Sequence, residues 1–141
     1  MRGYRGEVSR RLINPPELYD GVPYSYVAVA PEGGTVYTAG ACPLDAEGAI
    51  VGPGDVGAQT RQTLDNLLVA LRAAGCGLED VVKTTVYVAS SDHADLVAAW
   101  EVVEAEFGRD GPPGTLLGVS VLGFTGQLVE IEAVALQPAA G

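Results

Sequence analysis

The sequence predicts an α+β domain with a two-layer architecture, in which two helices cover one face of a single mixed sheet in the order ββαβαββ. Segments that alternate like strands occur twice near the start, once in the middle and twice near the end, with two helix-like segments between them. The last strand candidate, residues 128–136, also has two different faces. Its face of small apolar residues is typical of a strand that packs against helices.

Residues 1–21 precede this pattern and are predicted to form an arginine-rich N-terminal arm. Four of the eight basic residues lie in the first eleven positions, and Pro15 and Pro16 interrupt the segment. Within it, residues 8–13 could form a short strand. The composition fits an arm that docks on a neighbouring subunit and fits a frayed terminus equally well.

The first two strands are predicted at residues 24–30 and 35–39, which are rich in β-branched and aromatic residues. Residues 31–34, Pro-Glu-Gly-Gly, are typical of a hairpin turn, so the two strands are expected to pair. Residues 40–54 are expected to follow as a loop.

A long helix is predicted at residues 56–74, because Asp55 is a suitable N-cap and Gly75 a suitable C-terminal stop. Apolar residues recur at helical spacing along its core face. They are Leu64, Leu67, Leu68, Leu71 and Ala74. The polar residues expected on its other faces are Gln59, Arg61, Gln62, Asp65 and Arg72.

A third strand is predicted at residues 81–88, and a second helix after it. The residues expected on one face of the strand are Val82, Thr84, Val86 and Val88. Asp92 is expected to cap the helix, with Asp95 completing a short capping box, and Gly108 is expected to end it. The buried stripe of this helix is expected to be Leu96, Trp100, Val103 and Phe107.

The closing segment, residues 112–136, is predicted to be a hairpin whose turn lies at residues 123–126. A single domain would then span residues 22–137, followed by a loose tail at residues 138–141. No helix is expected on the other face of the sheet. A sheet that is covered on one side only and carries apolar residues on the other predicts association with further copies of the chain.

The other face of residues 128–136 carries two carboxylates, Glu130 and Glu132. On a strand that is otherwise apolar, a carboxylate requires water, a partner or a catalytic task. Glu132 is expected to pair with a basic residue or to face water.

The net charge of −10 disfavours nucleic-acid binding. Beyond residue 11, four basic side chains stand against seventeen acidic ones, because only Glu7 of the eighteen acidic residues lies earlier, and such a surface repels phosphates. No apolar run is long enough for a membrane span or a signal peptide. Cys42 and Cys76 make no disulfide framework, so we expect a cytoplasmic protein with neither nucleic-acid nor membrane partners.

Five segments taken together resemble the Rid (YjgF) family over residues 21–136. They are VPYS (22–25), YTAGACPLD (37–45), QTRQTLDNL (59–67), DVVKTTVYV (80–88) and VEIEAVA (129–135). The resemblance implies a homotrimer whose sheets line the centre, with small-molecule sites between subunits. It also implies hydrolysis of enamines and imines to keto acids and ammonia without a metal or other cofactor. Some members have instead been named ribonucleases or translation inhibitors.

The resemblance also implies roles for individual residues. Glu130 would be the catalytic residue that places or deprotonates water, and Tyr24 would line the pocket. Backbone groups near Gly40 and Leu116 would hold polar atoms of the substrate. From the residues alone, Glu130 could equally be a structural carboxylate and Tyr24 an aromatic residue of the subunit interface.

The position of the family's substrate-binding arginine is occupied by Gly114, followed by Thr115. A guanidinium clamps a carboxylate through two hydrogen bonds, and losing such a contact costs on the order of 2–5 kcal/mol. We therefore expect 2-imino acids to be poor substrates, and a neutral or cationic ligand to fit better. Arg109 could bend back to replace the guanidinium, although a solvated loop arginine is its more ordinary role.

Cys42 lies near the predicted pocket and could be a nucleophile. The only histidine, His93, is expected in a solvated first helical turn and could not activate it, so an unreactive thiol is expected. One histidine and two separated cysteines predict no metal site. The leading hypothesis is a hydrolase of imines or related compounds. A non-catalytic trimer that binds a metabolite is the alternative, and an endoribonuclease ranks third.

Overall fold

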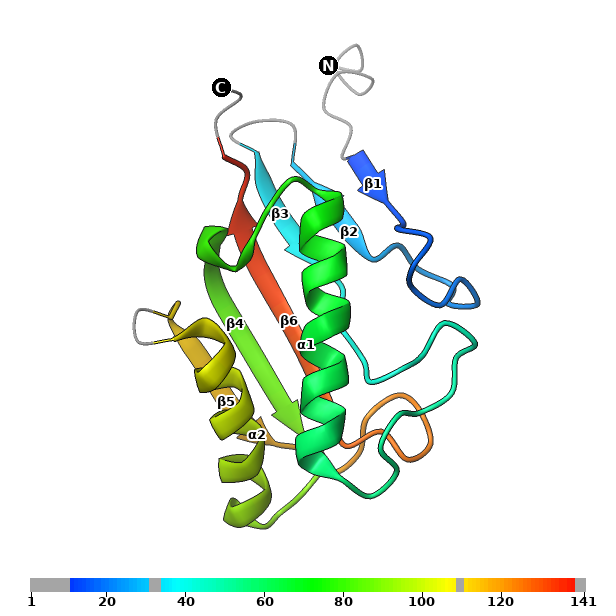
Figure 1. The fold of residues 1–141 in the computed structure, drawn as a ribbon, viewed down its shortest axis with the longest axis vertical. Coiled ribbons are helices and arrows are strands. Elements are labelled where there is room, and N and C mark those ends of the chain that lie inside the picture. Colours follow the sequence, from blue (N-terminus) through cyan, green and yellow to red (C-terminus); the bar gives the residue numbers. More distant parts are fainter. Residues whose placement is uncertain (1–10, 31–33, 109–110, 139–141) are drawn as a thin grey trace, which may run out of the picture.

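The computed structural model describes residues 11–30, 34–108 and 111–138 (Figure 1), and every structural statement below concerns these residues. The predictions for the first ten residues of the arm, for the turn at residues 31–33 and for Arg109 lie outside them. The prediction of a loose tail falls largely on residues 139–141 and also lies outside them.

Six strands form one mixed sheet in the order β1-β2-β3-β6-β4-β5. Neighbouring strands are antiparallel except β4 and β5, which are parallel. The strands are β1 (Arg11–Ile13), β2 (Val27–Val29), β3 (Thr35–Thr38), β4 (Val81–Val88), β5 (Gly114–Gly118) and β6 (Val129–Leu136). The predicted α+β class is confirmed, and β1 forms at the end of the segment considered for a short strand.

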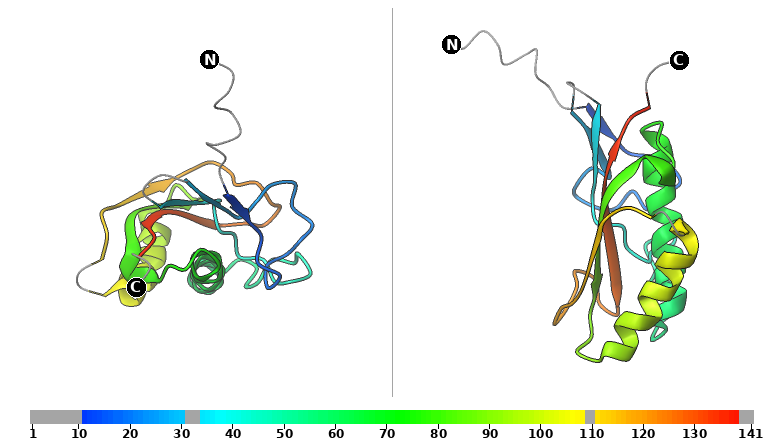
Figure 2. Two further views of the ribbon diagram at one scale, coloured as in Figure 1. Left: turned by 90° about the horizontal axis from the view of Figure 1, so that it is seen from above. Right: turned by 90° about the vertical axis from the view of Figure 1, so that its left-hand side faces the viewer.

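Both helices, α1 (Val56–Ala73) and α2 (His93–Phe107), lie on the same face of the sheet, as the right-hand view of Figure 2 shows. A short 3-10 helix, η2 (Leu78–Asp80), leads into β4. The described helices include none that is long and apolar enough to cross a membrane.

The ends of α1 are set by the residues that the sequence indicated. The Asp55 side chain accepts a hydrogen bond from the backbone amide of Ala58 at 2.9 Å. At the other end, Gly75 has a φ of 78°, and its amide and that of Cys76 bond back to carbonyls of the last turn. A residue with a Cβ would be strained at this φ, so the glycine ends the helix.

The two faces of β6 differ in burial as predicted. Its helix-facing residues are Val129, Ile131, Ala133 and Ala135, none more than 3% exposed. They pack against the leucines of α1 in one hydrophobic core. The opposite face of the sheet, called the open face here, has no described helix over it and leaves Leu12, Tyr37 and Leu136 between 46% and 52% exposed.

The predicted closing hairpin is wrong. β5 pairs in parallel with β4, and β6 pairs with the other edge of β4, so β4 separates them. Residues 119–128 therefore cross from one side of β4 to the other instead of forming a tight turn. The helix α2 makes the parallel arrangement of β4 and β5 possible, because a crossover helix brings the chain back to the start of the next strand.

Three side chains lie elsewhere than predicted. A bulge between Val81 and Lys83 turns Val82 outward, and Val81 takes the buried position. Gln59, expected on a polar face of α1, is fully buried. Asp95 does not complete a capping box, because its carboxylate accepts from the Ser90 hydroxyl instead.

Candidate functional site

Glu130 points from β6 toward the open face and lines a hollow of about 430 Å³. The other lining residues are Tyr24, Ala39, Gly40, Cys42, Gly123 and Phe124. They come from three parts of the chain: the approach to β2, the segment after β3, and the crossover between β5 and β6. The structure thus brings together four of the residues considered for the site, Tyr24, Gly40, Cys42 and Glu130, and adds Phe124.

A bulge after β3 places Gly40 against the Glu130 carboxylate. Tyr37 pairs with Val134 and Ala41 with Ile131, so four steps along one strand face three along the other. A Cβ atom on residue 40 would overlap Oε2 of Glu130. The requirement for glycine is therefore one of space, since its φ is not in the left-handed region.

A buried amide, Gln127, holds the carboxylate from the other side. Its Nε2 donates to Oε1 of Glu130 at 3.2 Å and to the Val129 carbonyl at 3.0 Å, while its Oε1 accepts from the Phe124 amide at 3.1 Å. Gln127 is 3% exposed, so these bonds are shielded from water. One side chain thus fixes both the carboxylate and the turn that carries Phe124.

Gln59 connects this turn to α1. Its Oε1 accepts from the Leu128 amide at 2.7 Å, and its Nε2 donates to the Gly126 carbonyl at 3.1 Å. Sequence reasoning missed both glutamines. A signal existed for Gln59, because it precedes Leu67 by eight residues and therefore shares its helix face. Nothing local marked Gln127, whose role depends on where β6 lies.

Cys42 is 8% exposed, and its thiol contacts the Gly40 carbonyl at 3.4 Å and Oε1 of Glu130 at 3.5 Å. Burial and the negative charge of Glu130 raise the pKa of Cys42 to about 12. The thiol is therefore protonated at neutral pH, which agrees with the expectation of an unreactive cysteine. Asn66 of α1 holds the cysteine loop by donating to the carbonyls of Cys42 and Leu44 at 2.8 Å each.

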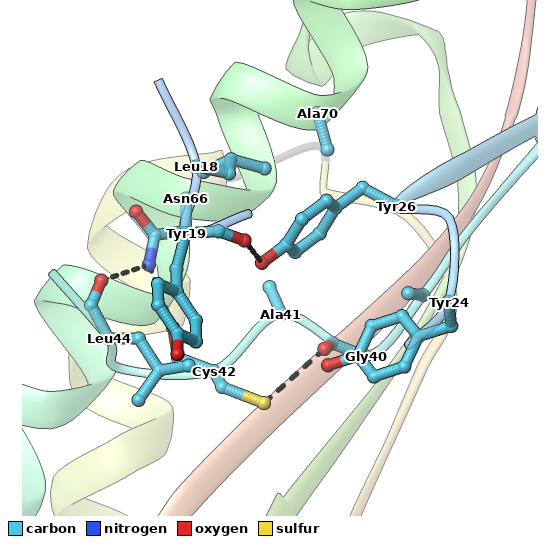
Figure 3. A pocket seen from close by; sticks show the side chains of 11 residues that line it. Leu18, Tyr19, Tyr24, Tyr26, Gly40, Ala41, Cys42, Leu44, Asn66 and Ala70 are labelled. Atoms are coloured by element: carbon cyan, nitrogen blue, oxygen red, sulfur yellow. Dashed lines mark hydrogen bonds between the residues drawn. The ribbon is translucent and has the colours of Figure 1, made fainter. Parts of the chain in front are cut away.

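Tyr24 stands at the rim of the hollow and is 42% exposed. Partial burial, followed by the nearby Cys42, raises the pKa of Tyr24 to about 12, so its hydroxyl stays neutral. Figure 3 shows Tyr24 beside Gly40 and the Cys42 thiol, with Tyr19 and Tyr26 around a small enclosed cavity behind them. Tyr24 packs edge-on against Tyr26, with ring centroids 5.9 Å apart, and this contact orients its ring.

The remaining predicted site residues lie elsewhere in the chain. Gly114 and Leu116 are on β5, two strands away from Glu130, because β4 lies between β5 and β6. Two strand spacings amount to about 10 Å. Within a single chain, the structure therefore does not unite the two halves of the predicted site.

Gly114 is also constrained by its neighbour on β4. A Cβ atom at this position would lie 2.8 Å from Oγ1 of Thr84, which is 2% exposed. The next residue, Thr115, accepts a hydrogen bond from Lys83 Nζ at 2.7 Å on the open face. Gly114 thus supplies no charge and leaves no room for a Cβ atom beside Thr84, while the Lys83 ammonium lies next to it at Thr115.

Glu132 differs from the expectation, because its partner is a tyrosine and not a basic residue. The Tyr87 hydroxyl donates to Oε1 of Glu132 across the β4–β6 pair. This bond, together with desolvation and the Glu132 charge, raises the pKa of Tyr87 to about 12. His93 is exposed, as expected of a first-turn residue, and Arg61 lies on a polar face of α1, where it contacts Glu106 at 3.1 Å.

Comparison with known proteins gives consistent results. The family model described as Endoribonuclease L-PSP matches residues 17–137. A RutC family protein of Pyrococcus horikoshii is 39% identical over 113 residues, covering 80% of this chain and 86% of that protein. The 2-iminobutanoate/2-iminopropanoate deaminase of Escherichia coli is 35% identical over 113 residues, covering 79% and 87%.

The solved structures include the YjgF gene product of Escherichia coli. It superposes with a TM-score of 0.74 at 31% identity and covers 91% of this chain and 99% of its own. A putative endoribonuclease from Thermotoga maritima gives a TM-score of 0.78 at 30% identity, with coverage of 93% and 99%. The similarity therefore extends over nearly the whole described domain.

Proposed function

The chain belongs to the Rid (YjgF) family, whose model is described as Endoribonuclease L-PSP, and from this premise we propose that it hydrolyses imines or enamines that lack a neighbouring carboxylate. The active unit is a homotrimer with small-molecule sites between its subunits. The observation that carries the proposal is the Glu130 carboxylate, which accepts from the buried Gln127 amide and lies against Gly40 in an open hollow.

The separation of the two half-sites supports an assembly. Glu130 and Leu116 lie two strands apart in one chain, which favours a site that takes them from different copies. The open face exposes apolar side chains that a second copy would cover, with Tyr37 at 52% and Leu136 at 48%. A particle mass of one chain in light scattering would contradict this part of the proposal.

The chemistry needs one group that handles a proton. Glu130 accepts a proton from water as the oxygen attacks the imine carbon and returns it to nitrogen, which gives a neutral carbinolamine. Glu130 then moves the carbinolamine hydroxyl proton to the same nitrogen, so the C–N bond breaks and a carbonyl compound and ammonia or an amine leave. Tyr24 and Cys42 stay neutral near Glu130, because their pKa values are raised to about 12, and they do not compete for this proton at neutral pH.

The preference against 2-imino acids follows from charge. No described cation lines the hollow, and Gly114 supplies none from the edge strand. Without a guanidinium to clamp the substrate carboxylate, the binding free energy is weaker by on the order of 2–5 kcal/mol, which corresponds to a roughly thirtyfold to several thousandfold lower affinity.

A matched substrate pair tests the proposal. 2-Iminopropanoate and propan-2-imine, which has a methyl group in place of the carboxylate, are generated in situ by enzymatic oxidation of the parent amines. The protein should accelerate hydrolysis of propan-2-imine and act at least about tenfold more slowly on 2-iminopropanoate. Equal or faster turnover of 2-iminopropanoate would show that Gly114 does not set the specificity.

A non-catalytic binding trimer is the second candidate, favoured by the missing guanidinium at Gly114. Glu130→Gln separates the two: lost turnover with retained ligand binding supports catalysis. No turnover of any imine by the wild type supports the binder. An endoribonuclease is disfavoured by the net charge of −10, and a nuclease assay with chelator controls tests it.

A further inference from the structure

The hollow around Glu130 has an unusual balance of charge. Among the side chains that line it, only the Glu130 carboxylate is formally charged at neutral pH. The two other ionisable groups, Tyr24 and Cys42, are held in their neutral forms by pKa values near 12. Within one chain, a ligand in this hollow therefore meets one negative charge and no positive one from the residues that line it.

The carboxylate itself is only half satisfied. The donors that contact it, the Gln127 amide at 3.2 Å and the Cys42 thiol at 3.5 Å, both reach Oε1. No described donor reaches Oε2, the oxygen for which Gly40 leaves room. A thiol is a weak donor, so the charge of Glu130 is poorly neutralised by its own chain.

Two aromatic rings stand beside this carboxylate. Tyr24 and Phe124 line the hollow with Glu130, and both are partly exposed. The face of an aromatic ring attracts cations and gives nothing to an anion. Gln127 bonds both the Phe124 backbone amide and the Glu130 carboxylate, so it links the backbone that carries this ring to the carboxylate.

We propose that this hollow is a cation site, which binds the protonated, iminium or amidinium-like form of a planar ligand, with the cationic nitrogen on Glu130 and the π-system against Tyr24 and Phe124. The inference rests on the proposed function, since it states the charge class of that substrate. The cation-site inference can be tested separately from the hydrolase proposal, because hydrolysis of a neutral imine would satisfy the hydrolase proposal equally well.

Binding of the cation also suits the reaction. An iminium carbon is more electrophilic than the carbon of a neutral imine, so water adds to it more readily. The balance is R₂C=NH₂⁺ with H₂O giving R₂C=O and NH₄⁺, and no oxidant or reductant is needed. The carboxylate first pairs with the N–H⁺ group and then takes the proton from the attacking water.

A series of three planar probes of equal shape tests the charge class. Benzamidinium is a cation, benzamide is neutral and benzoate is an anion, and binding of each to the purified full chain is measured by calorimetry or NMR titration. Benzamidinium should bind at least about tenfold more tightly than benzamide, and benzoate should not bind. Equal affinity for benzamide and benzamidinium would overturn the proposal.

Two variants assign the effect to one carboxylate. Glu130→Gln should reduce benzamidinium affinity to the level of benzamide, whereas Glu132→Gln, on the same face of the same strand, should leave it unchanged. A preference for the cation that survives in Glu130→Gln would contradict the assignment. If that variant fails to fold, salt supplies a second measurement, because added NaCl should weaken benzamidinium binding and leave benzamide binding unchanged.

The outcomes separate this inference from the proposed function. Turnover of propan-2-imine that needs Glu130, without any preference for benzamidinium, would overturn the cation site and leave the hydrolase standing. A Glu130-dependent preference for benzamidinium, with no turnover of any imine, would support the cation site and overturn the hydrolase.

Discussion

Glu130 and Glu132 lie two residues apart on the same face of β6, yet their surroundings have little in common. Glu130 is enclosed by groups from distant parts of the chain: a glycine after β3, a buried glutamine from the crossover, and a thiol. Glu132 meets a single partner, the Tyr87 hydroxyl on the adjacent strand β4. The first carboxylate lines a hollow, and the second lies on the sheet surface.

The difference shows that a carboxylate becomes a candidate site through its non-local neighbours. Both glutamates follow the same alternation, so local pattern assigns them one face and nothing more. Only Glu130 has an oxygen without a described donor beside an open space. The predictions below test whether this contrast governs function and stability.

The largest expected difference is in catalysis. Glu130→Gln should lower turnover of propan-2-imine by about 10²- to 10⁴-fold, because it removes the carboxylate that, among the described residues lining the hollow, is placed to exchange a proton with water. Glu132→Gln should stay within about threefold of the wild type, since Glu132 accepts from Tyr87 and does not line the hollow. Steady-state kinetics on both variants checks the pair, and a comparable loss in Glu132→Gln would remove the contrast.

Adding an arginine is expected to have the next largest effect. Gly114→Arg combined with Thr84→Ala should raise 2-iminopropanoate hydrolysis roughly thirtyfold or more, by supplying the missing charge. Gly114→Arg alone should gain less, because its Cβ lies 2.8 Å from Thr84 Oγ1. Thr84→Ala alone is the control. If the two arginine variants are equally active, the packing of Thr84 is not limiting.

Filling the space beside Glu130 should affect both activity and folding. Gly40→Ala places a methyl group where Oε2 lies, so the carboxylate must move, and we expect about a tenfold loss of turnover and about 1–3 kcal/mol of stability. Gly57→Ala, in α1 with only an ordinary contact at 3.5 Å, should cost nothing or stabilise slightly. Kinetics and urea unfolding measure both, and a neutral Gly40→Ala would show that Glu130 is not tightly held.

Removing the buried amide of Gln59, which bonds the segment next to Glu130, should lower the stability of the domain more than removing a partly solvated amide. Gln59→Met leaves the Leu128 amide and the Gly126 carbonyl without partners, so it should cost about 1–3 kcal/mol. Gln62→Met, whose bond to Asn66 is partly solvated, should cost at most about 0.5 kcal/mol. Urea midpoints with unchanged slopes would support this, and equal losses would not.

The smallest expected effect is a dependence on alkaline pH. The Cys42 thiol has its pKa raised from 9.0 to about 12 in the folded chain, so the native state favours the protonated form. Its contribution is fully present below about pH 9 and is lost as the pH rises toward 12, where the folded thiol also ionises. The cost of Cys42→Ala should therefore shrink by about 1 kcal/mol between about pH 8 and about pH 9.7. A cost that does not change with pH would contradict the burial of a neutral thiol.

Much of this fold follows from local signals in the sequence. Asp55 and Gly75 bound α1 as predicted, since a cap and a left-handed glycine act within a few residues. The alternation of β6 was also predictable, because burial on one face imposes a period of two. The pairing of β5 was not, because both edges of β4 could accept it and only the path of the chain through α2 decides.

The candidate site also contains residues that the sequence could predict and residues that it could not. Glu130 and Tyr24 could be named from the sequence, because a carboxylate on an apolar strand and a family motif both drew attention to them. Gln127 could not be named, since its bonds depend on the crossover that replaced the expected hairpin. The bulge that admits Gly40 depends on the register between β3 and β6, which no short segment determines.

That bulge also restricts how this protein can be re-engineered. From Tyr37 to Ala41 the chain advances four residues while the paired segment of β6 advances three. Because of this extra residue, Ala41 lies on the buried face although Tyr37 lies on the open one. Deleting one residue between Tyr37 and Ala41 would shift the register, so that buried and exposed side chains of the following residues would exchange faces. Variants of this segment should therefore keep its length, and change side chains only.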